Sequence, residues 1–232
     1  IGLIGCGNIA ETYFRAQEYF NNINFVACAD INLDAAKKTA EQYNIIPLSV
    51  DEILKDKNID IILNLTIPQA HYEISKRALE SNKHVYCEKP MSVKFDDAKE
   101  LLNLAKKNSL YIGNAPDTFL GGGGQLTRNL IDNDDIGQIL TGNFIFAFPG
   151  VQDFHPSPES WFQEGGGPVI DLGPYFFTTL VNLLGPVKNI RGRGAKFSEK
   201  REYKAGPKKG ETFNVEIPTS YTVSYTHLTL PT

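Results

Sequence analysis

The stretch IGLIGCGNIA, residues 1–10, decides the fold of this 232-residue chain. Its first four residues read as the end of a buried strand, and a helical pattern runs from residue 9 to residue 20. Gly-x-Gly-x-x-Ala between a strand and a helix is typical of dinucleotide-binding turns, although glycine-rich turns also occur without a nucleotide. The glycines permit a tight turn and a close approach to a pyrophosphate, and the small alanine permits close helix–strand packing. The candidate cofactor-binding residues of this stretch are Gly5, Gly7, Asn8, Ile9 and Ala10.

The first half of the chain alternates short apolar runs with amphipathic segments, as βαβ units do. This alternation predicts a Rossmann-type doubly wound parallel sheet over residues 1–117. The expected strands are residues 1–4, 25–29, 59–65, 83–87 and 110–113, and the expected helices are residues 9–20, 33–43, 70–81 and 95–107.

The pattern changes near Pro116, and residues 118–222 predict a partial α+β domain. Four consecutive glycines, residues 121–124, either bring backbone N–H groups to a ligand or form a flexible joint. The expected elements that follow are a helix to residue 131, a strand over 142–148, a single helix over 169–184, and strands over 188–193 and 211–217.

Composition excludes several classes of protein. With 41% hydrophobic and 22% charged residues the chain predicts an ordinary globular protein, and no apolar run approaches the ~20 residues that span a bilayer. The net charge of -4 offers no basic surface for nucleic acid or for an anionic membrane. Three widely spaced cysteines predict a reducing, cytoplasmic location, and no spacing of His and Cys predicts a metal site.

Both ends of the sequence are unusual. The single methionine is Met91, so any export signal upstream of Ile1 lies outside the sequence. Residues 223–232, VSYTHLTLPT, match the translation of a transposon-end sequencing adapter followed by its index primer. We therefore expect these residues to be non-native read-through and the native sequence to end near Thr222.

An acidic residue closes the second predicted strand. Asp30 comes twenty residues after Ala10, where a carboxylate accepts the ribose hydroxyls of NAD and repels the 2′-phosphate of NADP. No arginine occupies position 31 or 32, so NAD is favoured over NADP. The alternative explanation of this aspartate is a helix cap or turn residue.

Two further loops follow predicted strands of the same sheet. Thr66, Pro68 and His71 come after one strand, and Glu88 and Lys89 come after the next. Ligands of open parallel sheets bind beyond the carboxyl ends of strands, so both loops are expected to border the cofactor. For His71 an ordinary residue of a helix N-terminus is the favoured explanation. For Lys89 a solvated lysine at a strand end is the default for an isolated motif, and the motifs below argue against it.

The order and spacing of four motifs resemble the Gfo/Idh/MocA oxidoreductase family across residues 1–222. The motifs are GLIGCGNIA from residue 2, Thr66-x-Pro68-x-x-His71, Cys87-Glu88-Lys89-Pro90, and Gly165-Gly166-Gly167-x-x-x-Asp171-x-Gly173-x-Tyr175. The resemblance implies an open, mainly antiparallel sheet in the second domain, which often mediates association, so a homo-oligomer is expected.

The resemblance also implies the catalytic residues Lys89, Asp171 and Tyr175, with Lys89 beside the nicotinamide and a Lys89–Pro90 bond able to be cis. Many relatives carry His where this chain has Tyr175. A tyrosine needs its pKa, ordinarily ~10, lowered to act as a base, and a nearby lysine does this. Asp171 and Tyr175 are four apart on a predicted helix and would share a face.

Two residues, His155 and Trp161, lie in a loop expected on the substrate side, although a surface loop with one packed aromatic explains them equally well. Many relatives have Arg directly after this Trp, and the chain has Phe162.

Together these features predict an NAD-dependent oxidoreductase that acts on a small-molecule substrate, a sugar, polyol or related secondary alcohol. Two alternatives stay open. One is an NAD-dependent glycosidase of the same family that uses transient oxidation, and the other is a non-catalytic sugar- or nucleotide-sensing regulator.

Overall fold

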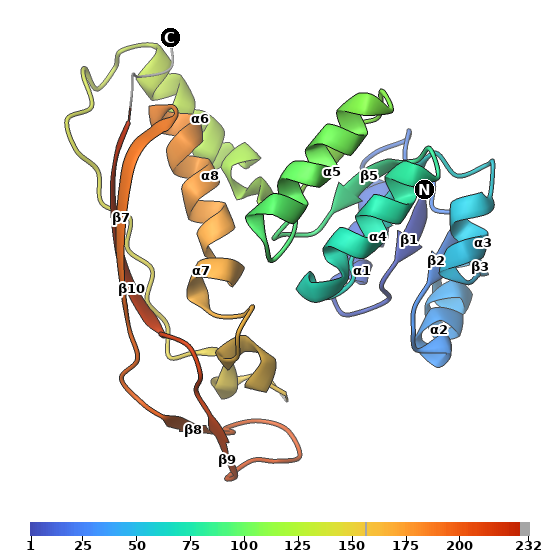
Figure 1. Cartoon of the computed structure of the whole chain (residues 1–232). Helices are drawn as coiled ribbons and strands as arrows, with labels where there is room; N and C mark the ends of the chain where they lie inside the picture. The colour runs from blue at the N-terminus through green and yellow to red at the C-terminus, as the bar shows by residue number, and fades with distance from the viewer. Residues whose placement is uncertain (156, 228–232) are drawn as a thin grey trace. The chain divides into compact units, whose positions relative to one another are not determined.

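The computed structural model describes residues 1–155 and 157–227, and the chain divides into two compact units, Ile1–Ala115 and Pro116–Thr232. The first unit is a six-stranded sheet in the order β3-β2-β1-β4-β5-β6, with every pair parallel (Figure 1). This order confirms the predicted doubly wound sheet. From β1 the chain first adds strands on one side, β2 and β3, and then returns to add β4, β5 and β6 on the other, so the strand order reverses between β1 and β4. The strands are β1 (Gly2–Ile4), β2 (Ala27–Ala29), β3 (Ile46–Pro47), β4 (Ile61–Asn64), β5 (His84–Cys87) and β6 (Ile112–Asn114).

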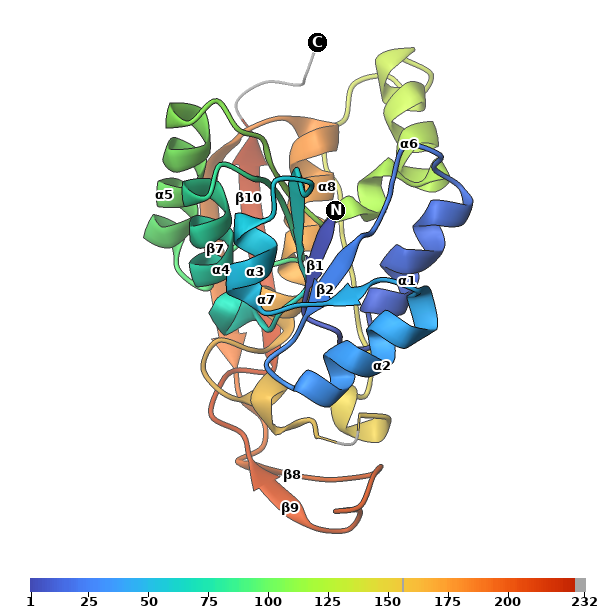
Figure 2. The ribbon, with the colours of Figure 1, turned by 90° about the vertical axis from the view of Figure 1, so that its right-hand side faces the viewer.

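Helices cover both faces of this sheet (Figure 2). One core joins α1 and α2 to the strands through residues such as Phe14, Ala40 and Leu63, and the other joins α3, α4 and α5 through Ile53, Leu79 and similar residues. Such two-sided burial explains why the strand sequences are apolar throughout rather than alternating. The helices are α1 (Ala10–Arg15), α2 (Leu33–Tyr43), α3 (Val50–Lys55), α4 (Pro68–Glu80) and α5 (Phe95–Lys107).

Three features of this unit differ from the sequence-based expectation. The strand β3 and the helix α3 were not predicted, although Ser49 and Glu52 form a reciprocal capping box at the start of α3. The helix expected over residues 9–20 ends at Arg15 and continues only as a 3₁₀ turn, Ala16–Glu18.

Among its described residues, the second unit combines three α-helices with two antiparallel strand pairs. β7 pairs with β10, and β8 pairs with β9. A small core of Phe162, Tyr203, Phe213 and Val215 lies near the shorter pair. The elements are α6 (Gly122–Asp132), α7 (Pro168–Asp171), α8 (Gly173–Leu184), β7 (Val187–Ala195), β8 (Lys200–Glu202), β9 (Thr212–Asn214) and β10 (Ser220–His227).

Two sequence-based predictions for this unit were wrong. Residues 142–148 form no strand in the described structure, and the Phe144 and Phe146 rings pack instead on Phe176, with centroids 4.9 and 5.5 Å away. The expected helix over 169–184 is divided at Leu172 into α7 and α8. Pro174 has no N–H to donate to the preceding turn, which breaks the helical ladder.

The predicted read-through tail falls partly within this unit. Residues 223–227 belong to β10, and Val223 pairs with Gly192 of β7. Strand pairing uses backbone groups that any sequence provides, so the origin of these residues stays a prediction. Residues 228–232 lie outside the described part of the chain. Within the part that is described, no helix has the length and apolar character needed to cross a membrane.

Candidate active site

The glycine-rich loop after β1 has two glycines with different roles. Gly5 has a φ of +105°, and a Cβ there would lie 2.5 Å from the backbone carbonyl of Leu65. Its N–H donates to the Ala29 oxygen at 2.8 Å, so this residue joins the ends of three strands. A Cβ on Gly7 would meet no atom within 4 Å. Gly5 is therefore required by the fold, and the space above Gly7 is open for a ligand.

The carboxylate of Asp30 holds the shape of this loop. Its Oδ2 accepts the Cys6 N–H at 2.7 Å, and its Oδ1 accepts the Asn32 N–H at 2.8 Å. A carboxylate has about four acceptor sites, so each oxygen retains capacity for a ribose hydroxyl. The exposed Asn8 and Ile9 and the buried Ala10 complete a surface that fits a dinucleotide.

A buried amide organises the loop after β4. The Asn64 side chain donates to the His71 carbonyl and to Ser75 Oγ, both at 3.0 Å. Its oxygen accepts the Thr66 N–H at 3.2 Å and the Thr66 hydroxyl at 2.7 Å. All the hydrogen-bonding capacity of this amide is thus used to fix the conformation between β4 and α4, with Pro68 as the first residue of α4.

The turn after β5 is held from three sides. The Tyr13 hydroxyl donates to Glu88 Oε1 at 2.8 Å, and the Lys89 N–H donates to Glu88 Oε2 at 3.0 Å. The Asn114 amide donates to the carbonyls of Cys87 and Glu88 at 2.8 and 3.0 Å. The Lys89–Pro90 peptide bond is cis, as the family resemblance implied.

The sheet brings the loops that carry the predicted residues of the first unit to one edge. Each of the loops that carry Gly5, Asp30, Thr66 and Lys89 follows the carboxyl end of a parallel strand. Neighbouring Cys87 is buried, and burial raises its pKa to about 12, which leaves a neutral thiol without nucleophilic character.

His71 is the exception among these residues. Its side chain is 1% exposed, with ring nitrogens facing the backbone oxygens of Pro90 and Thr66. The ring therefore supports the loops from behind rather than presenting a nitrogen at the surface.

In the second unit, Asp171 and Tyr175 lie on either side of the helix break. Asp171 ends α7, and its Oδ2 accepts the indole N–H of Trp161 at 3.0 Å. Tyr175 is in the first turn of α8, where its N–H donates to the Leu172 carbonyl at 3.1 Å. Trp161 thus joins Asp171, as a shared site requires, although the two candidate catalytic residues do not share one continuous helix.

The contacts of two other residues of the predicted substrate loop are with the protein itself. His155 is exposed, and its Nδ1 accepts the Ser157 N–H at 3.1 Å. Phe162 is fully buried, with the Arg201 guanidinium 5.1 Å from its ring centroid. The position after Trp161 therefore serves the core of this unit rather than a ligand contact.

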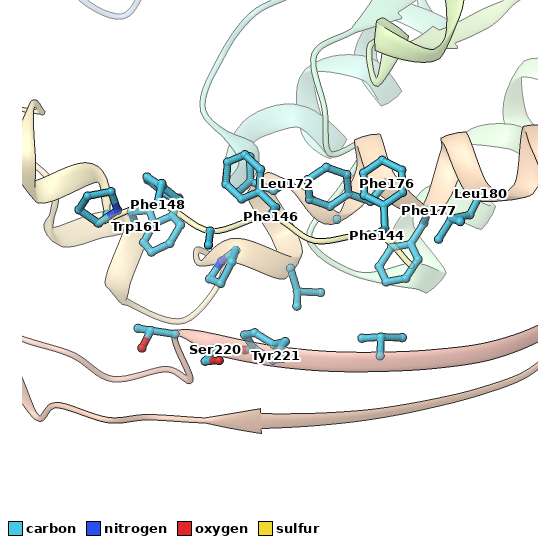
Figure 3. Close-up of a pocket in the computed structure, with 18 of the residues that line it drawn as sticks. Phe144, Phe146, Phe148, Trp161, Leu172, Phe176, Phe177, Leu180, Ser220 and Tyr221 are labelled. Carbon is cyan, nitrogen blue, oxygen red and sulfur yellow. The ribbon is translucent and has the colours of Figure 1, made fainter. Parts of the chain in front are cut away.

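A separate hollow of about 390 Å³ lies within the second unit (Figure 3). Its walls are mainly aromatic and aliphatic, and Arg201 is the charged residue among them. Asp171 and Tyr175 do not line it, so it is distinct from the candidate catalytic groups. Labelled lining residues include Phe144, Phe146, Phe148, Trp161, Leu172, Phe176 and Tyr221. Across residues 1–155 and 157–227, no cluster of three or more His, Cys, Asp or Glu side chains is arranged to hold a metal ion.

Sequence reasoning missed three residues that position the site, namely Tyr13, Asn64 and Asn114. Asn64 carried a readable signal, because it is the polar residue that ends an otherwise apolar strand. Tyr13 and Asn114 gave no comparable signal, since their partners Glu88 and Cys87 are 75 and 27 residues away.

Comparison with known proteins decides the family. Residues 1–114 match the model of an oxidoreductase family with an NAD-binding Rossmann fold, and residues 125–227 match the GFO/IDH/MocA C-terminal domain. The chain belongs to the Gfo/Idh/MocA family. An uncharacterised oxidoreductase of Schizosaccharomyces pombe is 31% identical over 152 residues, which are 64% of this chain and 40% of that protein.

Other members of the Gfo/Idh/MocA family align over more of the chain. Myo-inositol 2-dehydrogenase of Thermotoga maritima is 23% identical over 215 residues, which are 89% of this chain and 61% of that enzyme. The structure of levoglucosan dehydrogenase in complex with NADH and L-sorbose has a TM-score of 0.81 at 20% identity, covering 97% of this chain and 63% of that one. The chain thus spans about 40% to 60% of the length of these proteins, and the structural likeness shows the shared fold.

Proposed function

We propose that this chain belongs to an NAD-dependent oxidoreductase that acts on a sugar, polyol or related secondary alcohol or ketone. The observation that carries the proposal is the carboxyl edge of the first sheet. There the open surface above Gly7, the Asp30 carboxylate and the Lys89 turn follow strands β1, β2 and β5 of one parallel sheet. Ligands of such sheets bind at this edge, beside the strand-order reversal between β1 and β4.

The first unit would hold the cofactor through the loops that it orders. Gly5, Gly7, Asn8, Ile9 and Ala10 would lie along the pyrophosphate, and Asp30 would accept the ribose hydroxyls. The negative charge of Asp30 disfavours a 2′-phosphate, so NAD is preferred to NADP. Thr66, Pro68 and the Glu88–Lys89 turn would border the nicotinamide half.

For the catalytic chemistry we propose roles for Lys89, Asp171 and Tyr175. Bound NAD supplies the hydride acceptor for alcohol oxidation. Tyr175 would take the hydroxyl proton, and the Lys89 ammonium would stabilise the developing alkoxide and lower the tyrosine pKa. Asp171, whose Oδ2 is fixed by the Trp161 indole N–H, would orient the substrate or the Lys–Tyr pair. His155 and Trp161 would lie toward the substrate.

The substrate class rests on the family. The names of the Thermotoga and levoglucosan relatives point to a cyclic polyol or an anhydrosugar, and we extend that class to this chain. We assign residues 1–117 to cofactor binding and residues 118–222 to a partial substrate and association domain. A cytoplasmic homo-oligomer is the proposed setting.

Titration with NAD and NADP, followed by turnover with polyols and aldoses, tests the proposal. We expect NAD to bind at least about tenfold more tightly than NADP, a difference of about 1.4 kcal/mol. We also expect reduced nicotinamide to accumulate with at least one secondary alcohol. Circular dichroism is the folding control, and Asp30→Asn should narrow the preference for NAD.

The alternatives predict different outcomes of the same experiment. Release of a sugar without net reduction of NAD would favour the glycosidase. Saturable nucleotide binding without turnover of any alcohol, in a folded protein, would favour a sensing regulator. A folded chain that binds neither nucleotide would overturn the proposal.

A further inference from the structure

The ring of His71 lies between two backbone carbonyl oxygens. Its Nδ1 is 2.6 Å from the Pro90 oxygen, and its Nε2 is 2.9 Å from the Thr66 oxygen. The side chain is 1% exposed, so water does not take the place of either partner. Pro90 belongs to the turn after β5, and Thr66 belongs to the loop after β4. One buried ring therefore joins the two loops that border the proposed nicotinamide site.

The chemistry of the partners defines the protonation state of the ring. A carbonyl oxygen only accepts hydrogen bonds, and a neutral imidazole carries a hydrogen on one nitrogen only. In either neutral tautomer one nitrogen lone pair would face a carbonyl oxygen at less than 3 Å. Only the imidazolium, with an N–H on each nitrogen, donates to both oxygens.

Neither carbonyl is free to turn away from the ring. The Thr66 N–H and hydroxyl are both bonded to Asn64, which also donates to the His71 carbonyl. The turn that contains Pro90 is held by the bonds of Glu88 and Asn114. These bonds fix the conformation within each loop, whereas the His71 ring links the Thr66 loop to the Pro90 turn.

The charges around the ring act in opposite directions. His71 is the fourth residue of α4, where the helix dipole disfavours a cation, and two carbonyl dipoles favour it. The turn after β5 contributes the titratable groups Cys87, Glu88 and Lys89, and α4 itself contributes Tyr72 and Glu73. Cys87 stays a neutral thiol, since burial raises its pKa to about 12. The loop from Leu65 to Ile67 contributes no titratable side chain.

We propose that His71 is a positioning residue which, as a buried imidazolium, clamps the Thr66 loop to the Lys89–Pro90 turn and so holds Lys89 in place for hydride transfer. The role in transfer rests on the proposed function, whereas the charge state rests on the hydrogen bonds alone. Loss of one ring proton breaks one arm of the clamp and frees the turn from the loop.

Nitrogen-15 NMR of the histidine rings in the 232-residue chain tests the charge state directly. At neutral pH both ring nitrogens of His71 should carry hydrogens and give the similar shifts of an imidazolium. His84 is the internal control, because its Nδ1 accepts the Tyr111 N–H at 3.0 Å and must be unprotonated. A single protonated nitrogen on His71, with widely separated shifts, would overturn the proposal.

Kinetics of His71→Gln test the positioning role, with His84→Gln as the matched control. Glutamine keeps one donor but cannot satisfy two carbonyls as a cation does. We expect kcat to fall about 10-fold to 10²-fold, with KM for NAD changed less than about threefold, because small displacements near the reacting atoms are costly.

The experiments distinguish failure of the His71 clamp from failure of the proposed function. An imidazolium at His71 in a protein without any turnover would contradict the proposed function and leave the clamp intact. A neutral His71 in an active enzyme would contradict the clamp alone. An unchanged kcat in folded His71→Gln would remove the positioning role.

Discussion

The two units hold their candidate site residues by different means. In residues 1–115 parallel strands end at one edge, and buried amides such as Asn64 tie the following loops to the main chain. In the second unit Asp171 lies at a helix break beside the indole of Trp161, and β7 is exposed along nearly its whole length. Backbone topology thus positions the candidate residues of the first unit, and aromatic side chains position those of the second. Substitutions should therefore disturb fold and site together in the first unit, and mainly orientation in the second.

The largest expected effect comes from removing the two groups proposed to meet the substrate. Lys89→Met should lower turnover by about 10²-fold to 10³-fold, because it removes the charge that stabilises the alkoxide. NAD affinity should stay within about tenfold, as binding rests on the glycine loop. Steady-state kinetics with calorimetric titration measures both quantities, and Lys99→Met on exposed α5 is the matched control.

The same experiment extends to Tyr175. Tyr175→Phe should cost about 10²-fold to 10⁴-fold, the range of general base catalysis. Residues that act as one unit are strongly non-additive, so the double variant should be little worse than the poorer single variant. Additive losses would show that the lysine and the tyrosine work independently.

The next largest effect separates the two glycines of the loop. Gly5→Ala should lower the free energy of unfolding by roughly 3 kcal/mol, since its Cβ would overlap the Leu65 carbonyl at a positive φ. Gly7→Ala should change stability by less than about 0.5 kcal/mol and weaken NAD binding at least about tenfold. Urea unfolding and NAD titration of both variants provide the test. Equal stability losses in the two variants would contradict the division of roles.

A pair of substitutions compares the two ways of holding the site. Asn64→Leu leaves the Thr66 N–H and other buried groups without partners and should cost about 2–3 kcal/mol. Trp161→Phe removes one indole hydrogen bond to Asp171 and keeps the aromatic packing, so it should cost about 1 kcal/mol. Urea unfolding of each variant measures the difference. If Trp161→Phe proves less stable than Asn64→Leu, the hydrogen bond to Asp171 contributes more to stability than the bonds of Asn64, and the expected order of the two units is wrong.

The smallest effect concerns networks of Tyr, Glu and Lys side chains that occur in both units. A hydrogen bond from Tyr203, with help from Lys208, lowers the pKa of Glu159 to about 2, and Lys76 with Tyr72 lowers the pKa of Glu100. A folded-state pKa below the unfolded value stabilises the protein above pH 4.5 and loses this effect as pH falls toward 2. Unfolding of Glu159→Gln should differ from wild type by less than about 1 kcal/mol near neutrality, because the pair is solvated.

The pH dependence provides the check on this last prediction. The difference between wild type and Glu159→Gln should shrink as the pH falls. Glu164→Gln, at an exposed position of the same unit, should show no such trend. A difference that stays constant with pH would rule out the ionisation as its cause.

The parts of the fold that were predictable are those specified by local sequence. Apolar strands, glycine spacing and helix periodicity gave the first sheet and α5 with its observed limits. The β3 strand escaped because it has two exposed residues, one of them a proline. The alternating aromatics around Phe146 indicated a strand, but these rings pack on α8. This packing is a long-range tertiary contact, which the local sequence pattern does not specify. Pro174 indicated a break in the helix expected over 169–184, but the continuous apolar pattern led to the prediction of a single helix.

The site was predictable to the level of which loops form it, and not of how they are held. Chain topology alone carried Asp30 and Lys89 to the same edge of the sheet. The partners of His71, by contrast, are backbone oxygens 5 and 19 residues away, and a sequence does not reveal which carbonyls a buried ring will meet. The identity of a side chain thus indicated its chemistry, but not which hydrogen bonds hold the site loops in place.

The double use of Asp30 has a consequence for protein engineering. If the proposed preference for NAD holds, a designer who wished to favour NADP would replace this acid with a small or basic residue. That replacement would also remove the acceptor of the Cys6 and Asn32 N–H groups, so the glycine loop would lose its anchor in the same step. Cofactor exchange in this scaffold therefore requires a second substitution that restores an acceptor for the loop, and single-site libraries at position 30 should yield weaker binders of both nucleotides.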